Sequence, residues 1–401
     1  MAQLTKMGMR MNTIIELAEA HQQCRRQAIN LIVSENRLSE QVSKLLSNDL
    51  ASRYAAPFYA GTDISQEITQ LATEKTKSVF SSQFANISPT SGSNSLMAVV
   101  FALTEPGDKV ARVPPFFPGG GYPFQYEVFH RQSLPLIFDD AQWQLDKQAC
   151  IDLLIKEQPK LVILGASIFM VPMPVREICE VVHSYGGVVA YDGSHSLGLI
   201  AGSEYQDPLE EGADILFGST HKTFPGPQGG LILTNSELLH KKIELVSNFT
   251  PLNGPTMICN PHLARIAALG LTLDEVPWQR YADQIVKNAR AFASTFKQNG
   301  FTLRGEANQN FENSTYCHQV LPLLDKETGV KHRDKLKAHG IFCDGFMRVG
   351  TAEITRLGFT EHDSAHIAQL MCDVVNSAEP VLNEVKEQVD ALVRSHTEIV
   401  M

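Results

Sequence analysis

The sequence VVAYDGSH at residues 188–195 decides the fold of this 401-residue chain. Its first half has the length and the β-branched content of a buried strand, and this strand ends in an acid, Asp192. A second apolar run, DILFG at residues 214–218, leads directly into STHKT at residues 219–223. Because parallel strands bring their carboxyl ends to one edge of a sheet, we expect Asp192 and Lys222 to face one crevice there.

The preceding segments extend this pattern into a sheet. LVILG at residues 161–165 predicts another buried strand, with Ser167 just after its end. Residues 174–185 predict a helix, with Pro174 in its first turn and two glycines just past its end. Strand, helix and strand in this order form a βαβ unit, so the sheet is predicted to be mostly parallel.

An acid and a lysine that face one crevice suit pyridoxal phosphate. The Lys222 amine would form a Schiff base with the cofactor aldehyde, and Asp192 would keep the pyridine nitrogen protonated so that the ring accepts electrons. Both residue types are also common after strands in proteins without this cofactor. SPTSGSN at residues 88–94, before an apolar helix, adds a predicted phosphate cup, for which N-capping by serine is the alternative.

The charge and cysteine content exclude several classes of protein. The chain carries 34 basic and 44 acidic side chains, a net charge of −10, which argues against nucleic acid and membranes as partners. Seven dispersed cysteines without a Cys-x-x-Cys pair indicate reduced thiols, and no metal site is predicted. The sequence shows no signal segment and no membrane-spanning run, which predicts a cytoplasmic protein.

The helical and strand patterns divide the chain into three parts. Residues 1–45 predict an N-terminal arm with a helix, residues 46–270 a large cofactor-binding domain, and residues 271–401 a smaller C-terminal α/β domain. Long amphipathic helices are expected at residues 64–80 and 278–299.

Four segments, taken together and in this order, resemble the serine hydroxymethyltransferases. They are LIVSEN at 31–36, SGS at 91–93 with EPGD at 105–108, DGSH at 192–195, and THKT at 220–223 with GPQGG at 226–230. The resemblance covers most of the chain and weakens in the last quarter. It implies a fold-type I pyridoxal phosphate-dependent transferase, an α/β protein with a mostly parallel sheet in the large domain and a smaller C-terminal α/β domain.

The resemblance assigns roles to individual residues around the cofactor. It implies that Lys222 carries the Schiff base, that Asp192 pairs with the pyridine nitrogen, and that His195 acts near the phenolic oxygen of the ring. The other residues that it places on the cofactor or its phosphate are Ser91, Gly92, Ser93, Ser167, Ser219 and His221. These roles agree with the chemistry, because a dianionic phosphate needs hydrogen-bond donors and a carbanion needs a protonated ring.

The same resemblance implies how the substrate and a second subunit take part. The implied substrate-binding residues are Ser34, Tyr54, Tyr59 and Arg356, with both tyrosines on an aromatic loop that reaches the site of a neighbouring chain. Members of the family are at least homodimers, with the cofactor at the interface. A homodimer or a dimer of dimers is therefore expected here, with a small amino acid as substrate.

The aromatic loop departs from the family pattern in a way that bears on function. It is several residues shorter, and Ala56 stands where the family has a glutamate that handles protons during one-carbon transfer. Alanine transfers no proton, and Asp63 or Glu67 could replace the glutamate only with a rearranged backbone.

Other departures affect the cofactor ring and the substrate carboxylate. The arginine of the family's GTPxxTxRG is displaced by one residue, to Arg356, and Arg348 is the second candidate for binding the carboxylate. The ring-stacking histidine of the family falls on Gly120, with Tyr122 as a replacement, and Cys259-Asn260 stands in place of a Gly-Gly pair.

These observations favour an enzyme that acts at the Cα of a small amino acid. The predicted reaction is folate-independent aldol cleavage of a β-hydroxy amino acid, or transfer of an aldehyde or hydroxymethyl unit. Racemisation, transamination and decarboxylation are the alternatives, because they start from the same Schiff base. A non-catalytic protein that binds the cofactor is a further hypothesis. The sequence separates these reactions poorly, because the residues that select among them are the ones that diverged.

Overall fold

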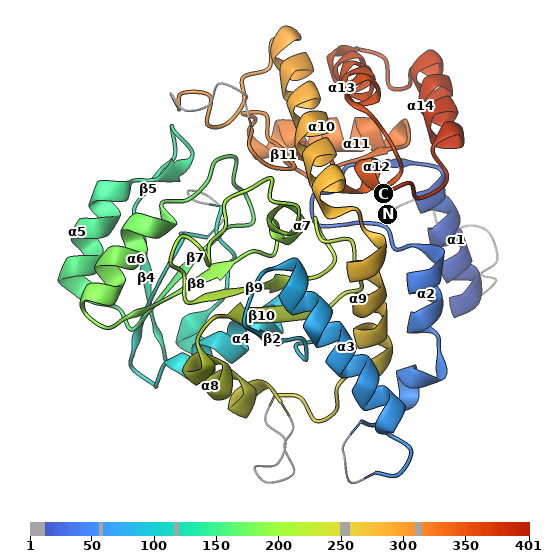
Figure 1. Ribbon diagram of the computed structural model, residues 1–401. Coiled ribbons are helices and arrows are strands. Elements are labelled where there is room, and N and C mark those ends of the chain that lie inside the picture. Colours follow the sequence, from blue (N-terminus) through green and yellow to red (C-terminus); the bar gives the residue numbers. More distant parts are fainter. Residues whose placement is uncertain (1–12, 56–58, 116–119, 249–256, 309–314) are drawn as a thin grey trace.

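A seven-stranded sheet lies at the centre of the larger part of the molecule (Figure 1). The computed structural model describes residues 13–55, 59–115, 120–248, 257–308 and 315–401. In order across the sheet, the strands are β2 (Phe84–Asn86), β10 (Gly230–Thr234), β9 (Ile215–Ser219), β8 (Val188–Asp192), β7 (Leu161–Leu164), β3 (Lys109–Arg112) and β4 (Gln132–Pro135). Strands β9, β8, β7, β3 and β4 run parallel, and β10 runs antiparallel to β9 and β2. The predicted α/β fold with a mostly parallel sheet is confirmed.

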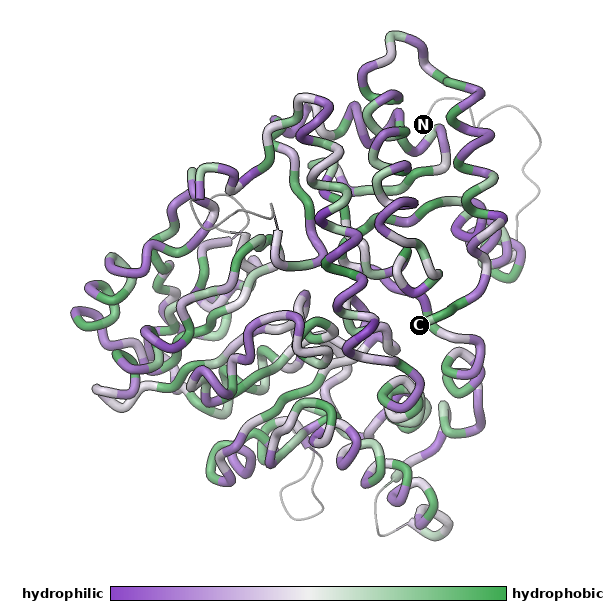
Figure 2. Tube along the Cα trace, turned by 45° about the horizontal axis from the view of Figure 1, so that its top comes forward, coloured by the Kyte–Doolittle hydropathy of each residue, from purple (hydrophilic) through white to green (hydrophobic). Residues whose placement is uncertain are grey.

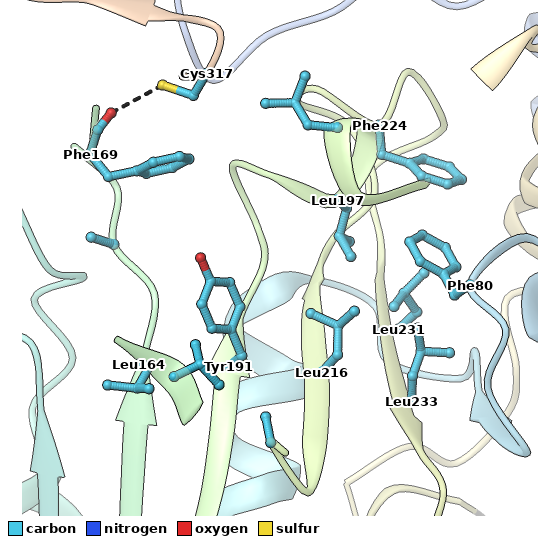
Figure 3. Packing of buried hydrophobic residues seen from close by; sticks show 14 of the residues in the cluster. Phe80, Leu164, Phe169, Tyr191, Leu197, Leu216, Phe224, Leu231, Leu233 and Cys317 are labelled. Carbon is cyan, nitrogen blue, oxygen red and sulfur yellow. Dashed lines mark hydrogen bonds between the residues drawn. The ribbon is translucent and has the colours of Figure 1, made fainter. Parts of the chain in front are cut away.

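The central strands are apolar on both sides, and helices cover both faces of the sheet. Every residue of β7, β9 and β10 is buried, as expected for strands inside an α/β sheet. Leu164, Tyr191 and Leu216 point into the core on one face, shown in close view in Figure 3. Ile163 and Phe217 point to the opposite face.

Each face has its own set of helices. The face of Leu164 packs against α3 (Asp63–Val79), α5 (Lys147–Glu157), α6 (Val175–Ser184), α7 (Leu197–Ala201) and α9 (Leu263–Glu275). The opposite face packs against α4 (Gly92–Leu103) and α8 (Glu237–Ser247). In Figure 2 hydrophilic and hydrophobic colours alternate along much of the chain, as expected where helices have one buried side. Within the described ranges, no helix is long and apolar enough to cross a lipid bilayer.

A second, smaller core forms around the C-terminal third of the chain. It contains buried residues from α11 (Lys326–Ala338), α13 (Glu361–Asn376) and α14 (Asn383–Ser395). Its short strands are β11 (Gln319–Val320), β12 (Ile341–Phe342) and β13 (Val349–Gly350), followed by α12 (Ala352–Arg356). Further short elements of the chain are η1 (Asp49–Ser52), η2 (Tyr126–Phe129), β5 (Phe138–Asp139) and β6 (Gln144–Leu145).

Two segments connect the two cores. Helix α10 (Trp278–Gln298) contributes Tyr281 and Ile285 to the large core, and Phe292 and Phe296 to the small core. The N-terminal strand β1 (Ile29–Asn30) pairs in parallel with β12 and thus joins the small core. The predicted domain boundaries at residues 45 and 271 stay predictions.

The N-terminal segment has two helices on either side of β1. Helix α1 (Ile14–Arg26) has no buried residue, and α2 (Glu40–Leu46) packs against α9. Ser39 caps α2 by accepting a hydrogen bond from the main-chain N–H of Val42.

The packing around Phe224 predicts a large loss of stability on truncation. Phe224 is fully buried, with its ring 4.8 Å from that of Trp278 and 6.2 Å from that of Phe80. Phe224→Ala should lower the free energy of unfolding by about 3–5 kcal/mol, measured by urea denaturation, because the surrounding rings cannot close the cavity. Leu238→Ala, at a residue 64% exposed, is the matched control. Equal effects of the two substitutions would contradict this packing.

Candidate active site

The carboxyl ends of the parallel strands surround a cavity of about 220 Å³. Strand β8 ends at Asp192 and β9 at Ser219, and α4 starts beside them. The cavity brings together all the residues predicted to bind the cofactor, namely Ser91, Gly92, Ser93, Ser167, Asp192, His195, Ser219, His221 and Lys222. Residues from four separate segments of the sequence thus meet at one place, as the strand order predicts.

One end of the cavity is a cradle at the start of α4. Ser91 caps this helix, since its hydroxyl accepts a hydrogen bond from the Asn94 N–H at 3.0 Å. A Cβ on Gly92 would lie 3.0 Å from both the Ser194 hydroxyl oxygen and the Ser219 Cβ, so a side chain there would fill the cradle. Small residues, hydroxyl groups and the positive end of a helix dipole fit a phosphate group.

Asp192 lines the cavity and is partly buried. Its Oδ1 accepts a hydrogen bond from the Ser194 N–H at 2.9 Å. Burial raises the pKa of Asp192, while Ser194 and the Lys222 charge oppose that shift. A carboxylate in this place fits a protonated pyridine nitrogen, which would supply the missing positive charge.

Lys222 is buried in the same cavity. Burial lowers its pKa to about 8, with the Asp192 charge opposing this shift and the Arg348 charge adding to it. Near physiological pH the lysine therefore has far more neutral amine, the form that attacks an aldehyde, than an ordinary lysine with a pKa of about 10.4.

Hydrogen bonds from other parts of the chain fix the backbone around Lys222. The Asn36 side-chain amide donates to the Lys222 carbonyl at 2.5 Å and to the Tyr281 hydroxyl at 2.8 Å. The Tyr281 hydroxyl in turn donates to the Thr223 carbonyl at 3.0 Å. Gly198 of α7 lies against the same carbonyl so closely that any side chain would displace it. Asn36 belongs to the LIVSEN segment, so one function of this motif is to hold the backbone at Lys222.

Three histidines lie at or behind the cavity. The rings of His195 and His318 stack with centroids 5.7 Å apart. Burial lowers the pKa of His195, and lowers the pKa of His221 to about 4 and that of His318 to about 3, so all three are neutral imidazoles. His318 was not predicted, because the sequence around it indicates only a strand.

The two candidate arginines for the substrate carboxylate differ in placement. Arg348 is not itself a lining residue, but its Nη1 donates to the carbonyl of Ser167, which lines the cavity, at 2.8 Å. Arg356, the first choice from sequence, is 1% exposed and its Nη2 pairs with Glu275 at 2.9 Å, away from the cavity lining. Displacement by one residue rotates a helical side chain by about 100°, which accounts for the different direction of Arg356 on α12.

The remaining predicted substrate residues do not line this cavity. Ser34 is half-buried and lies two residues before Asn36 in the sequence. Tyr54 and Tyr59 are 52% and 45% exposed, and their ring centroids are 5.6 Å apart. Their contribution to the site of a neighbouring chain stays a prediction. Ala56 lies outside the described residues.

The residues considered as replacements have different positions. Asp63 and Glu67 are exposed on α3, outside the cavity lining. Tyr122 lines the cavity, and its hydroxyl lies 2.8 Å from that of Ser93. Gly120 lies behind it, with its carbonyl accepting hydrogen bonds from the N–H groups of Ser167 and Ile168. Tyr122 therefore lies at the cavity, and its role as a replacement for the ring-stacking histidine stays a prediction.

Comparison with known proteins agrees with this geometry. The family model described as serine hydroxymethyltransferase matches residues 5–371. Serine hydroxymethyltransferases from Picrophilus torridus and Methanopyrus kandleri are 36% and 33% identical to this chain. The alignments cover 94% and 97% of this chain and 90% and 94% of those relatives.

A solved structure shares the fold. The L-threonine transaldolase from Pseudomonas fluorescens, in its internal aldimine state, superposes with a TM-score of 0.82 at 24% identity, covering 95% of this chain and 90% of that one.

Together, the fold and the cavity define a fold-type I pyridoxal phosphate-dependent enzyme. Within this class, the chain belongs to the serine hydroxymethyltransferase family. The resemblance that four short motifs indicated is thereby confirmed, and so is pyridoxal phosphate as the cofactor. Like its relatives, the protein acts at the Cα of an amino acid.

The burial of Lys222 predicts how cofactor capture depends on pH. The neutral amine attacks the aldehyde, so the capture rate of cofactor-free protein should rise with pH and level off above its pKa of about 8. An exposed lysine would keep gaining rate toward its ordinary pKa of about 10.4. Stopped-flow absorbance with added pyridoxal phosphate measures this rate. A rate that still climbs well above pH 8 would contradict the buried placement.

Proposed function

We propose that this enzyme catalyses folate-independent aldol chemistry on a small β-hydroxy amino acid, either cleavage or transfer of the aldehyde or hydroxymethyl unit. One observation carries the proposal: among the described residues that line the cavity, Asp192 is the one carboxylate. Because Asp192 faces the pyridine nitrogen in this proposal, it is not available for proton transfer to a folate. The glutamate that serves this purpose in the family is replaced by Ala56.

Each residue of the cavity has a separate role in this proposed reaction. Pyridoxal phosphate, when bound, supplies an electron sink for charge that develops at Cα. Lys222 would hold the cofactor through its amine, and Asp192 would keep a proton on the pyridine nitrogen. The start of α4 holds the phosphate through Ser91, Gly92 and Ser93.

A neutral imidazole can accept the proton of the substrate β-hydroxyl group. His195 and His221 both line the cavity, and both have a buried Nδ1 without a hydrogen-bond partner in the structure. Their lowered pKa values keep them unprotonated at neutral pH, so they can act as bases. Loss of the hydroxyl proton leads to cleavage of the bond between Cα and Cβ and to release of an aldehyde.

We further propose that Arg348, and not Arg356, binds the substrate carboxylate. Arg348 lies directly behind the lining residue Ser167, to whose carbonyl it donates, and its charge lowers the pKa of both Lys222 and His195. Arg356 already has a carboxylate partner in Glu275. A guanidinium near the reacting lysine can orient the amino acid by charge-assisted hydrogen bonds.

The proposal predicts release of an aldehyde without folate. Proton NMR with serine or threonine and no tetrahydrofolate should show formaldehyde or acetaldehyde together with glycine. Lys222→Ala should abolish this activity and any cofactor link that survives borohydride reduction, because it removes the amine that holds the cofactor.

Three other outcomes would overturn this assignment. Aldehyde transfer that requires tetrahydrofolate would indicate the ordinary family reaction. Loss of the Cα proton in heavy water without aldehyde would indicate racemisation, and a keto acid would indicate transamination.

We also propose that the protein forms a homodimer. Helix α1 has no buried residue, yet Ile14, Ile15 and Leu17 are 82%, 70% and 50% exposed. Helix α3 similarly exposes Ile64 and Leu71, at 72% and 58%. Apolar surfaces of this kind on regular helices favour contact with another chain. The neighbouring chain would also bring its Tyr54 and Tyr59 to the cavity.

The cytoplasmic location of the protein stays a prediction.

The homodimer predicts a mass in solution of at least twice that of the chain, measured by light scattering. Ile14→Glu with Leu17→Glu should shift the protein toward monomer, because burying two carboxylates in an apolar interface is costly. Ile155→Glu on α5, where the side chain is also 55% exposed, is the matched control and should leave the mass unchanged. A monomeric wild-type protein at every concentration would refute the dimer.

A further inference from the structure

The guanidinium of Arg348 is fixed on two of its three nitrogens. Its Nε donates to Asp344 Oδ2 at 2.8 Å. Its Nη1 donates to the Ser167 carbonyl at 2.8 Å and lies 3.4 Å from Gln319 Oε1. Gln319 is itself held, since its Nε2 donates to the same Ser167 carbonyl at 3.1 Å. The Arg348 and Asp344 side chains are only 12% and 23% exposed, so this arrangement is shielded from water.

Asp344 also holds the backbone that carries Arg348. Its Oδ1 accepts hydrogen bonds from the N–H of Phe346 at 2.9 Å and of Arg348 at 3.0 Å. Its main-chain carbonyl accepts a third bond, from the N–H of Met347 at 3.0 Å. Asp344 therefore binds three consecutive N–H groups of the turn and the side chain at its end.

The turn that Asp344 closes contains a strained residue. Met347 has a φ of +57°, a left-handed conformation that is unfavourable for residues with a side chain, and its side chain is fully buried. Such a conformation persists only where the surroundings hold it, and it is common next to functional groups. The three bonds to Asp344 hold this one in place, so the direction of Arg348 is set by the turn.

We infer that Asp344 is a positioning residue that presents Nη2 of the Arg348 guanidinium to the substrate carboxylate. Asp344 binds Nε, and Ser167 and Gln319 bind Nη1. Within the described part of the chain, Nη2 is therefore the nitrogen left to donate charge-assisted hydrogen bonds to a carboxylate. This inference rests on the proposed role of Arg348.

The experiment compares four variants by steady-state kinetics with threonine, with bound cofactor measured by absorbance. They are Asp344→Asn, Arg348→Gln, the double variant, and Asp334→Asn as a control. Asp334 forms an exposed ion pair with Arg333 on α11, with a side-chain N···O distance of 2.7 Å. It is therefore the same kind of Asp–Arg pair as Asp344 and Arg348, but it lies outside the candidate active site. Asp344→Asn keeps a side-chain oxygen that can close the turn, but it removes the charge that binds Nε.

For Asp344→Asn we expect KM to rise roughly tenfold with kcat changed by less than about threefold, because a misdirected guanidinium weakens binding more than chemistry. The double variant should have the KM of Arg348→Gln, since Asp344 acts only through Arg348. Cofactor content should be unchanged throughout, which separates this effect from a general loss of structure, and Asp334→Asn should match wild type.

The outcomes separate this inference from the proposed function. An unchanged KM in Arg348→Gln would refute the role of Arg348 and the inference with it. A raised KM in Arg348→Gln with an unchanged or lowered KM in Asp344→Asn would refute the inference alone. If Asp344→Asn loses cofactor, the comparison is repeated with Asp344→Ser, whose hydroxyl can accept a hydrogen bond from the turn but does not reach Nε. Loss of cofactor in both variants would show a structural role for Asp344 and would overturn the inference.

Discussion

Burial of the Lys222 amine beside the Asp192 carboxylate is the constraint on which the rest of the structure depends. Neither charge would be stable there alone, because moving an ion from water into a protein interior costs roughly several kcal/mol, even after the surrounding protein has relaxed around it. Each group lies at the end of a buried parallel strand, so the sheet fixes their separation. The lowered pKa of the amine and the raised pKa of the acid both result from this placement. Cofactor chemistry uses the reactivity that burial creates.

The parts of the site that follow from local sequence could be predicted. Asp192 and Lys222 end recognisable strands, and Ser91 caps a recognisable helix, so their positions follow from strand order and helix geometry. Arg348 and His318 could not be ranked in the same way. They approach the cavity from the small core, and the contacts that place them, with Ser167 and His195, join residues more than 100 positions apart.

Arg356 shows the limit of motif alignment in physical terms. A displacement of one residue leaves a sequence motif recognisable, yet on a helix it turns the side chain to another neighbour, here Glu275. The burial of Arg356 and its ion pair indicate a structural role between α9 and α12. Motif alignment alone does not distinguish this structural role from substrate binding, because both roles need an arginine next to a carboxylate.

The pairing of β1 with β12 has a consequence for the synthesis of the protein. Asn36 follows β1 directly and holds the Lys222 carbonyl, while β1 itself needs Ile341 and Phe342 as partners. A nascent chain on the ribosome can form the strands around Lys222 early, but it cannot fix the lysine until some 85% of its length has emerged. Cofactor attachment therefore belongs to the last stage of folding, when nearly the whole chain is free of the ribosome.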